Sequence, residues 1–178
     1  MLVKTLDPLS LLDIGVGFGK YGFLAREYLE LWDGREKYLE WRRRIDGVEG
    51  CAEYITSLQR LIYNNIYLGN AQAVLPTLQF RYDLILLIDV IEHFTKEEGR
   101  AILKQCQRLG KNMIISTPKD TIMREGTFGN PLEAHVSQWT LDDFRPLGNY
   151  FVVNNQKSLL VFIGEDAAAL LGKLKGQA

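Results

Sequence analysis

The most constraining feature of the sequence is a short apolar run that ends in closely spaced glycines, LLDIGVGFGKYG at residues 11–22. The apolar run, which begins at residue 9, is typical of a buried strand, and glycine allows the tight backbone turn that follows it. Residues 20–31 then carry apolar side chains at helical spacing. This order of strand, glycine turn and helix is the repeating unit of a parallel α/β sheet.

The same pattern recurs along the chain. Further strands are expected at residues 45–49, 82–88 and 112–116, and helices at residues 53–63 and 96–109. The segment YDLILLI at residues 82–88 is apolar without alternation, which is typical of a central strand covered on both faces.

The order changes near the end of the sequence. Residues 150–153 and 158–163 are both strand-like and are separated by a short turn region, so we expect them to pair antiparallel. A short helix is expected from residue 165 onward. We therefore predict an α/β fold with a Rossmann-like, doubly wound sheet, mostly parallel and ending in a C-terminal antiparallel hairpin.

Length and charge narrow the class of protein. The 178 residues, 47% of them hydrophobic, predict one domain over residues 1–178. The sequence has 21 basic and 22 acidic residues, so its net charge does not favour general binding to nucleic acid or anionic membranes. The three arginines at residues 42–44 are interpreted as a solvated helix end or rim. No membrane span or signal peptide is predicted, and the isolated Cys51 and Cys106 form no disulfide or zinc pattern, so we expect a cytoplasmic protein.

The glycine run fits two cofactor templates. Residues 15–19 read G-x-G-x-G, whereas residues 17–22 read G-x-G-x-x-G, the spacing of dinucleotide-binding sites. The dinucleotide template expects a ribose-binding acid about 20 residues further on, where positions 37 and 38 hold Lys and Tyr. It also leaves Asp13 unexplained. A nicotinamide-dependent oxidoreductase is therefore the alternative rather than the leading hypothesis.

Together with Asp13, the first template becomes D-x-G-x-G-x-G, and here the sequence resembles the class I S-adenosylmethionine-dependent methyltransferases. The resemblance continues at the ends of the later strands, with Glu49, Gly69-Asn70-Ala71, Asp89-Val90-Ile91-Glu92-His93-Phe94 and Ser116-Thr117-Pro118. It implies a seven-stranded methyltransferase fold with S-adenosylmethionine (SAM) as cofactor and S-adenosylhomocysteine (SAH) as product.

The resemblance also implies which residues bind the cofactor: Asp13, Gly15, Gly17, Gly19, Glu49, Asn70, Ala71 and Asp89. The glycines would let the backbone approach the methionine part, and the buried carboxylate of Asp13 would be partnered by the cationic ligand. The two oxygens of Glu49 can accept hydrogen bonds from both ribose hydroxyls, while Asn70 and Ala71 would contact the adenine. Asp89 either binds the methionine ammonium or caps the next helix.

The acceptor side of the site is indicated by two histidines. His93, after Glu92, is either a structural or a catalytic residue. Residues 119–138 form a connection long enough to be a substrate lid, and near its end His135 and Trp139 resemble the H-x-x-x-W pattern of methyltransferases that act on small molecules. We favour His135 as a general base; Trp139 either packs or contacts substrate.

These features favour transfer of a methyl group to oxygen of a small molecule or a glycan or lipid intermediate. The Asn/Asp-Pro-Pro-Tyr signature is absent, which argues against nucleobase or glutamine acceptors. Only about nine residues precede the first strand, so little or no N-terminal cap is expected. A second copy in a homodimer, another protein or the 119–138 loop could then complete the pocket. A non-catalytic, cofactor-binding relative remains a further alternative.

No metal is expected, because the only two histidines, His93 and His135, show no cluster of residues with ligand spacing around them.

Overall fold

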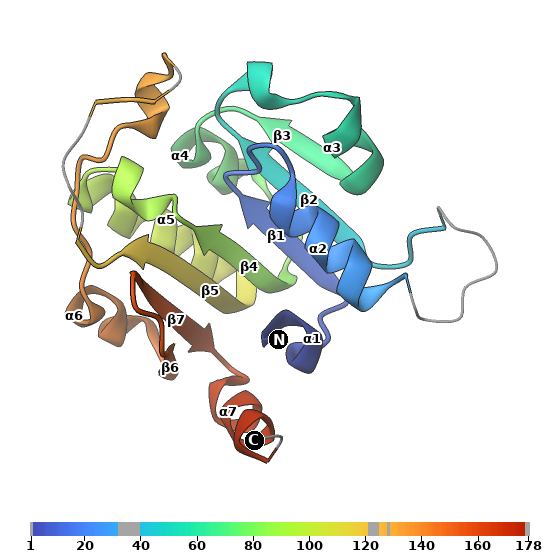
Figure 1. Cartoon of the computed structure of the whole chain (residues 1–178), viewed down its shortest axis with the longest axis vertical. Helices are drawn as coiled ribbons and strands as arrows, with labels where there is room; N and C mark the ends of the chain where they lie inside the picture. Colours follow the sequence, from blue (N-terminus) through green and yellow to red (C-terminus); the bar gives the residue numbers. More distant parts are fainter. Residues whose placement is uncertain (1, 32–39, 121–124, 128, 177–178) are drawn as a thin grey trace.

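The protein is built around one seven-stranded sheet with strand order β3-β2-β1-β4-β5-β7-β6 (Figure 1). The computed structural model describes residues 2–31, 40–120, 125–127 and 129–176. The strands are β1 (Ser10–Ile14), β2 (Arg44–Glu49), β3 (Asn65–Leu68), β4 (Tyr82–Ile88), β5 (Gly110–Pro118), β6 (Tyr150–Val153) and β7 (Ser158–Gly164). β1 to β5 pair in parallel, and β7 runs antiparallel to both β5 and β6. The predicted doubly wound sheet with an antiparallel C-terminal hairpin is confirmed.

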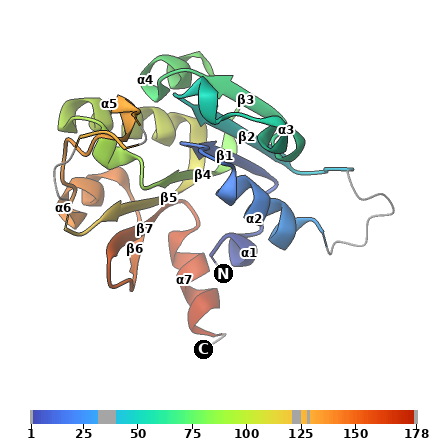
Figure 2. The same ribbon diagram turned by 45° about the horizontal axis from the view of Figure 1, so that its top comes forward.

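Helices cover both faces of the sheet (Figure 2). One face packs against α1 (Leu2–Leu6), α2 (Lys20–Leu29), α3 (Ser57–Ile62) and α7 (Ala167–Lys175). The other packs against α4 (Ala71–Val74), α5 (Lys96–Leu109) and α6 (Leu141–Phe144). Short 3-10 helices complete the connections: η1 (Ala52–Tyr54), η2 (Leu75–Thr77), η3 (Ile91–His93), η4 (Pro131–Glu133) and η5 (Arg145–Leu147).

The central strand β4 explains why its sequence is apolar without alternation. Leu84 and Leu86 enter the core beneath α2 and α7, whereas Ile85 and Leu87 enter the core beneath α4 and α5. Since successive side chains of a strand point to opposite faces, a strand covered on both sides requires apolar residues at every position.

The prediction of one continuous helix over residues 53–63 is wrong. The segment expected to be helical over residues 53–63 is divided into η1 and α3, with extended backbone at Thr56. The Thr56 side chain and Gln59 form a capping box that begins α3, and a threonine at this position starts a helix rather than continuing one.

Two other differences concern the N-terminal half. α1 is not expected from the sequence, and α2 ends at Leu29, slightly earlier than predicted. Positions 37 and 38, which bear on the dinucleotide template, lie outside the described residues.

Two of the three arginines predicted to form a solvated rim make hydrogen bonds or ion pairs within the fold. The guanidinium of Arg43 donates to the carbonyl of Pro8 at 2.6 Å and to Asp7 at 2.7 Å. Arg44 pairs with the buried Asp46 at 2.7 Å.

In the described part of the chain, no helix has the length and apolar character needed to cross a bilayer.

Candidate functional site

The glycine turn lies at the carboxyl end of β1, beside the carboxyl end of β4. The chain leaves β1 and β4 toward opposite sides of the sheet, so a crevice forms between them. Gly15 has φ +82°, and a Cβ atom there would lie 2.4 Å from Cγ2 of Val90. Only glycine fits this close approach between the turn after β1 and the segment after β4.

Glu49, at the end of β2, holds the glycine turn in place. Its Oε2 accepts a hydrogen bond from the backbone N–H of Gly17 at 2.8 Å, and its Oε1 accepts one from Cys51 at 2.8 Å. The Gln59 amide donates to the carbonyl of Gly17 at 2.9 Å. Each carboxylate oxygen retains a second acceptor site, so Glu49 can accept further hydrogen bonds from a ligand.

A cavity of about 310 Å³ occupies the crevice, within the size range of small-molecule sites. The sequence-predicted residues that line it are Gly15, Gly17, Glu49, Asn70, Ala71, Asp89 and His93. Sequence reasoning named none of the lining residues that come from η1 and from the predicted lid: Tyr54, Asn130, Leu132 and Glu133. No spacing in the sequence links these two distant segments.

Asp13 does not line the cavity, and one of its carboxylate oxygens has a hydrogen-bond partner within the fold. Its carboxyl group is 1% exposed, and Oδ2 accepts a 2.5 Å hydrogen bond from the Tyr63 hydroxyl. Burial raises the pKa of Asp13 to about 7, against the lowering effect of the Tyr63 hydrogen bond. The Tyr63 hydroxyl therefore satisfies Oδ2 of Asp13, whereas Oδ1 is buried without a hydrogen-bond partner.

The same tyrosine accounts for Gly22, the last glycine of the dinucleotide template. The Gly22 backbone N–H donates to the Tyr63 hydroxyl at 3.1 Å, and a Cβ atom at Gly22 would lie 2.3 Å from Cζ of Tyr63. Glycine is thus needed at position 22 for packing, so the second glycine template requires no dinucleotide.

Gly19 and Asn70 have local structural roles. Gly19 precedes α2 with φ +96° and does not line the cavity. The Asn70 side-chain oxygen accepts from the Gln72 backbone N–H at 2.9 Å and caps α4. Asn70 nevertheless lines the cavity together with Ala71, the first residue of α4.

Asp89, immediately after β4, adopts a backbone conformation that is uncommon for a non-glycine residue, with φ +54°. Its Oδ1 accepts from the Ser116 hydroxyl at 2.9 Å, and its backbone N–H donates to the Ser116 carbonyl at 2.9 Å. The N-cap of η3 is Val90, without a side-chain cap. Asp89 therefore does not cap the next helix, and its carboxylate lies at the cavity wall.

Part of the predicted lid, residues 119–138, lies at the cavity. The Asn130 amide donates to the Tyr54 hydroxyl at 3.1 Å, which joins the start of η4 to η1 at the cavity wall. Residues 121–124 and 128 of the predicted lid lie outside the described residues.

The end of this connection is bound to η3 by backbone and side-chain hydrogen bonds. The N–H groups of Val136 and Ser137 donate to the Glu92 carbonyl at 2.9 and 3.2 Å. The Trp139 indole donates to Ile91 at 3.1 Å and to the Ser137 hydroxyl at 2.8 Å. Trp139 is 2% exposed, so of its two sequence-based readings the structure favours packing.

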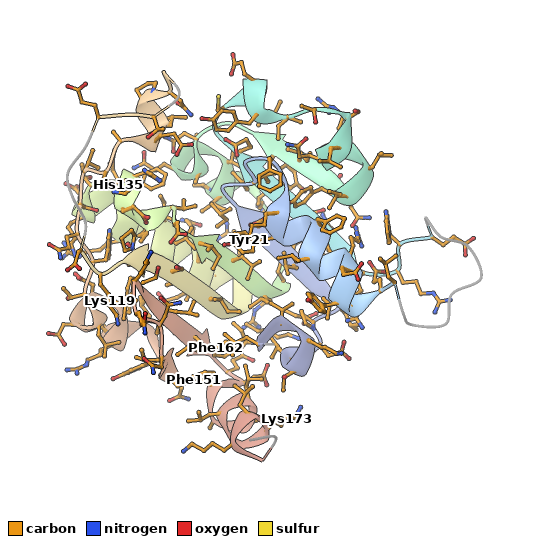
Figure 3. All side chains as sticks on the ribbon, viewed as in Figure 1. Tyr21, Lys119, His135, Phe151, Phe162 and Lys173 are labelled. Carbon is orange, nitrogen blue, oxygen red and sulfur yellow. The ribbon has the colours of Figure 1, made fainter. Side chains whose placement is uncertain are left out.

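This docking brings His135 to Glu92 and His93. One potential ligand atom from each of the three residues lies within 4.8 Å of the others, and the two imidazole ring centres are 5.1 Å apart. Figure 3 shows His135 on the connection that passes beside α5. The sequence-based reasoning that no such cluster forms around the histidines is wrong, because residues far apart in the chain meet here.

Comparison with known proteins identifies the fold. No protein-family model matches the chain, and no curated protein matches it. Among solved structures, the N-terminal domain of EvdMO1, determined in the presence of SAH and D-fucose, is 16% identical with a TM-score of 0.61, covering 91% of this chain and 78% of that one. Magnesium protoporphyrin IX methyltransferase (ChlM) from Synechocystis PCC 6803, with bound SAH, is 15% identical with a TM-score of 0.59, covering 90% and 76%.

A putative O-methyltransferase from Nostoc punctiforme PCC 73102 is 17% identical with a TM-score of 0.61; the match covers 90% of this chain but only 53% of that chain. At this level of identity the likeness concerns the fold. The seven-stranded, mostly parallel sheet and the antiparallel pairing of β7 agree with the sequence-based expectation. The chain therefore has the class I methyltransferase fold.

Proposed function

We propose that this protein is a SAM-dependent methyltransferase that methylates a hydroxyl oxygen of a small molecule or of a glycan or lipid intermediate. The observation that carries the proposal is one cavity that combines the glycine turn with three polar side chains at the carboxyl ends of β2, β3 and β4: Glu49, Asn70 and Asp89. The solved structures that contain SAH have the same fold.

The cavity residues fit the parts of SAM. A Cβ atom added at Gly17 would meet nothing within 4 Å, so the backbone there faces open space into which a ligand can pass. Glu49 lines the same cavity and keeps acceptor capacity for ribose hydroxyls. The carboxylate of Asp89 is suited to the ammonium group, and the start of α4 at Ala71 to the adenine.

When bound, SAM supplies an electrophilic methyl group, and transfer needs an acceptor oxygen placed in line and shielded from water. Leu132 and Glu133 line the cavity from the connection before α6 and would cover the ligands. His93, at the cavity wall, and His135 beside it place polar groups where an acceptor hydroxyl would lie. Three further expectations stay predictions. They are that a second copy of the chain completes this side of the pocket, that residues 1–178 form a single domain, and that the protein is cytoplasmic.

The proposal is tested by calorimetric titration of the protein with SAH, SAM and the nicotinamide dinucleotides. We expect SAH and SAM to bind and the dinucleotides not to bind. Replacement of Glu49 by Ala should weaken SAH binding by about 1.5–3 kcal/mol, the scale of hydrogen bonds to a charged group. Glu53→Ala, which removes an exposed carboxylate four residues further on, is the matched control and should leave the affinity unchanged.

Two results would contradict the proposal. Binding of a nicotinamide dinucleotide in preference to SAH would favour the oxidoreductase alternative. Tight binding of SAH without methyl transfer to any of a panel of hydroxylated acceptors would favour a non-catalytic relative.

A further inference from the structure

Glu92, His93 and His135 form a cluster with the composition of a metal site. Two imidazoles and one carboxylate are ligands that suit first-row divalent metals, and a site with three protein ligands leaves positions open for water or substrate. Glu92 is 1% exposed, whereas His93 and His135 are partly exposed, so the cluster is open on its histidine side. The geometry points to a binding site for a divalent transition-metal ion at these three residues.

The separation of the ligand atoms is compatible with this inference. They lie within 4.8 Å of one another. Ligands that share an ion at about 2.1 Å lie at most about 4.2 Å apart. Small changes in side-chain torsion angles within the same rotamers would move the ligand atoms by about 1 Å and close this difference.

A second, independent observation concerns the orientation of His93. Its Nδ1 lies 3.0 Å from the backbone carbonyl of Ala134. Because a carbonyl oxygen can only accept, Nδ1 carries the proton, and Nε2 keeps the lone pair that a metal needs. A ligand histidine whose other nitrogen donates to a backbone carbonyl is the usual outer-shell arrangement of metal sites.

The position of His135 is also fixed by the fold. The backbone N–H groups of Val136 and Ser137 donate to the carbonyl of Glu92, and the Ser137 hydroxyl donates to the carbonyl of Phe94 at 2.6 Å. The segment that carries His135 is therefore attached to the residues on both sides of His93. Such preorganisation lowers the cost of assembling a three-residue site from two distant segments.

The site adjoins the cavity, because His93 lines it. A bound divalent ion would hold an acceptor oxygen there and lower the pKa of its hydroxyl group. This consequence rests on the proposed function, whereas binding of the ion itself does not.

The inference is tested by titrating chelator-treated protein with Co²⁺ in the absence of cofactor, followed by visible absorption and calorimetry. We expect one equivalent to bind, and Glu92→Gln, His93→Ala and His135→Ala each to weaken binding at least tenfold. Glu97→Gln, an exposed carboxylate on α5, is the matched control and should bind Co²⁺ like the wild type. Cys51→Ser should also bind normally, which excludes coordination by the partly exposed thiol.

Thermal unfolding followed by circular dichroism checks that the variants fold. If Glu92→Gln fails to fold because Glu92 is buried, His135→Ala decides, since His135 lies outside the core. Absence of stoichiometric binding, or equal affinity of His135→Ala and wild type, would overturn the inference. SAH binding measured on the same samples separates the outcomes: loss of the metal site alone leaves the proposed function intact, and loss of SAH binding alone leaves the metal site intact.

Discussion

The hydrogen bond between Tyr63 and Asp13 makes a pH-dependent contribution to stability that Tyr63→Phe should reveal. The tyrosine hydroxyl donates to Oδ2 of Asp13 and accepts from the N–H of Gly22. Removal of the hydroxyl leaves a buried donor without its acceptor, which costs about 1–3 kcal/mol at any pH.

The additional cost depends on the charge of Asp13. Burial raises the folded-state pKa of Asp13 from 3.8 to about 7. The folded state therefore binds more protons than the unfolded state between these values, and the stability present below pH 3.8 is lost as the pH rises through about 7. Because the Tyr63 hydrogen bond lowers this pKa, Tyr63→Phe should raise it further and extend the loss to higher pH, by about 1.4 kcal/mol for each pH unit.

The measurement is urea unfolding of wild type and Tyr63→Phe at pH 5 and pH 8. The difference in unfolding free energy between the two proteins cancels the contributions of other titrating groups. We expect this difference to be larger at pH 8 than at pH 5 by about 1–2 kcal/mol. Tyr28→Phe, at a tyrosine that is 58% exposed, should change neither value. The same difference at both pH values would refute the assignment of an ionisable, buried Asp13 beside Tyr63.

Two further predictions follow from packing and charge. Trp139→Ala should lower the unfolding free energy by about 3–5 kcal/mol, because it empties a buried indole site; SAH titration of the folded variant should give the wild-type affinity, and a lost affinity at unchanged stability would contradict the packing role. Burial alone would raise the pKa of Asp83, but hydrogen bonds from Lys111 and Ser10 lower it, so its contribution is present above pH 3.8 and is lost as the pH falls through the folded-state pKa. Asp83→Asn should therefore reduce the loss of stability between pH 5 and pH 3 in urea unfolding, and an unchanged acid transition would contradict this.

The sequence by itself determined the positions of most strands and of the main helices α2 and α5. The apolar run of β4 and the helical periodicity of α5 are local patterns that agree with the tertiary fold, so their predicted bounds match those observed. The prediction fails at Thr56, where one capping side chain outweighs the apolar periodicity on either side. The glycine turn is also predictable, because its position after an apolar strand restricts what the backbone can do.

Only the tertiary structure decided which polar side chains face the cavity and which serve the fold. Asp13 and Glu49 both stand near strand ends in the sequence, yet one is enclosed with Tyr63 and the other lines the cavity. His135 is 42 positions from His93 in the numbering, and it reaches the Glu92–His93 pair through backbone hydrogen bonds that link the connection before α6 to η3. The physical reason is that the direction and partner of a polar side chain depend on long-range packing, whereas periodicity in the sequence reports only local burial.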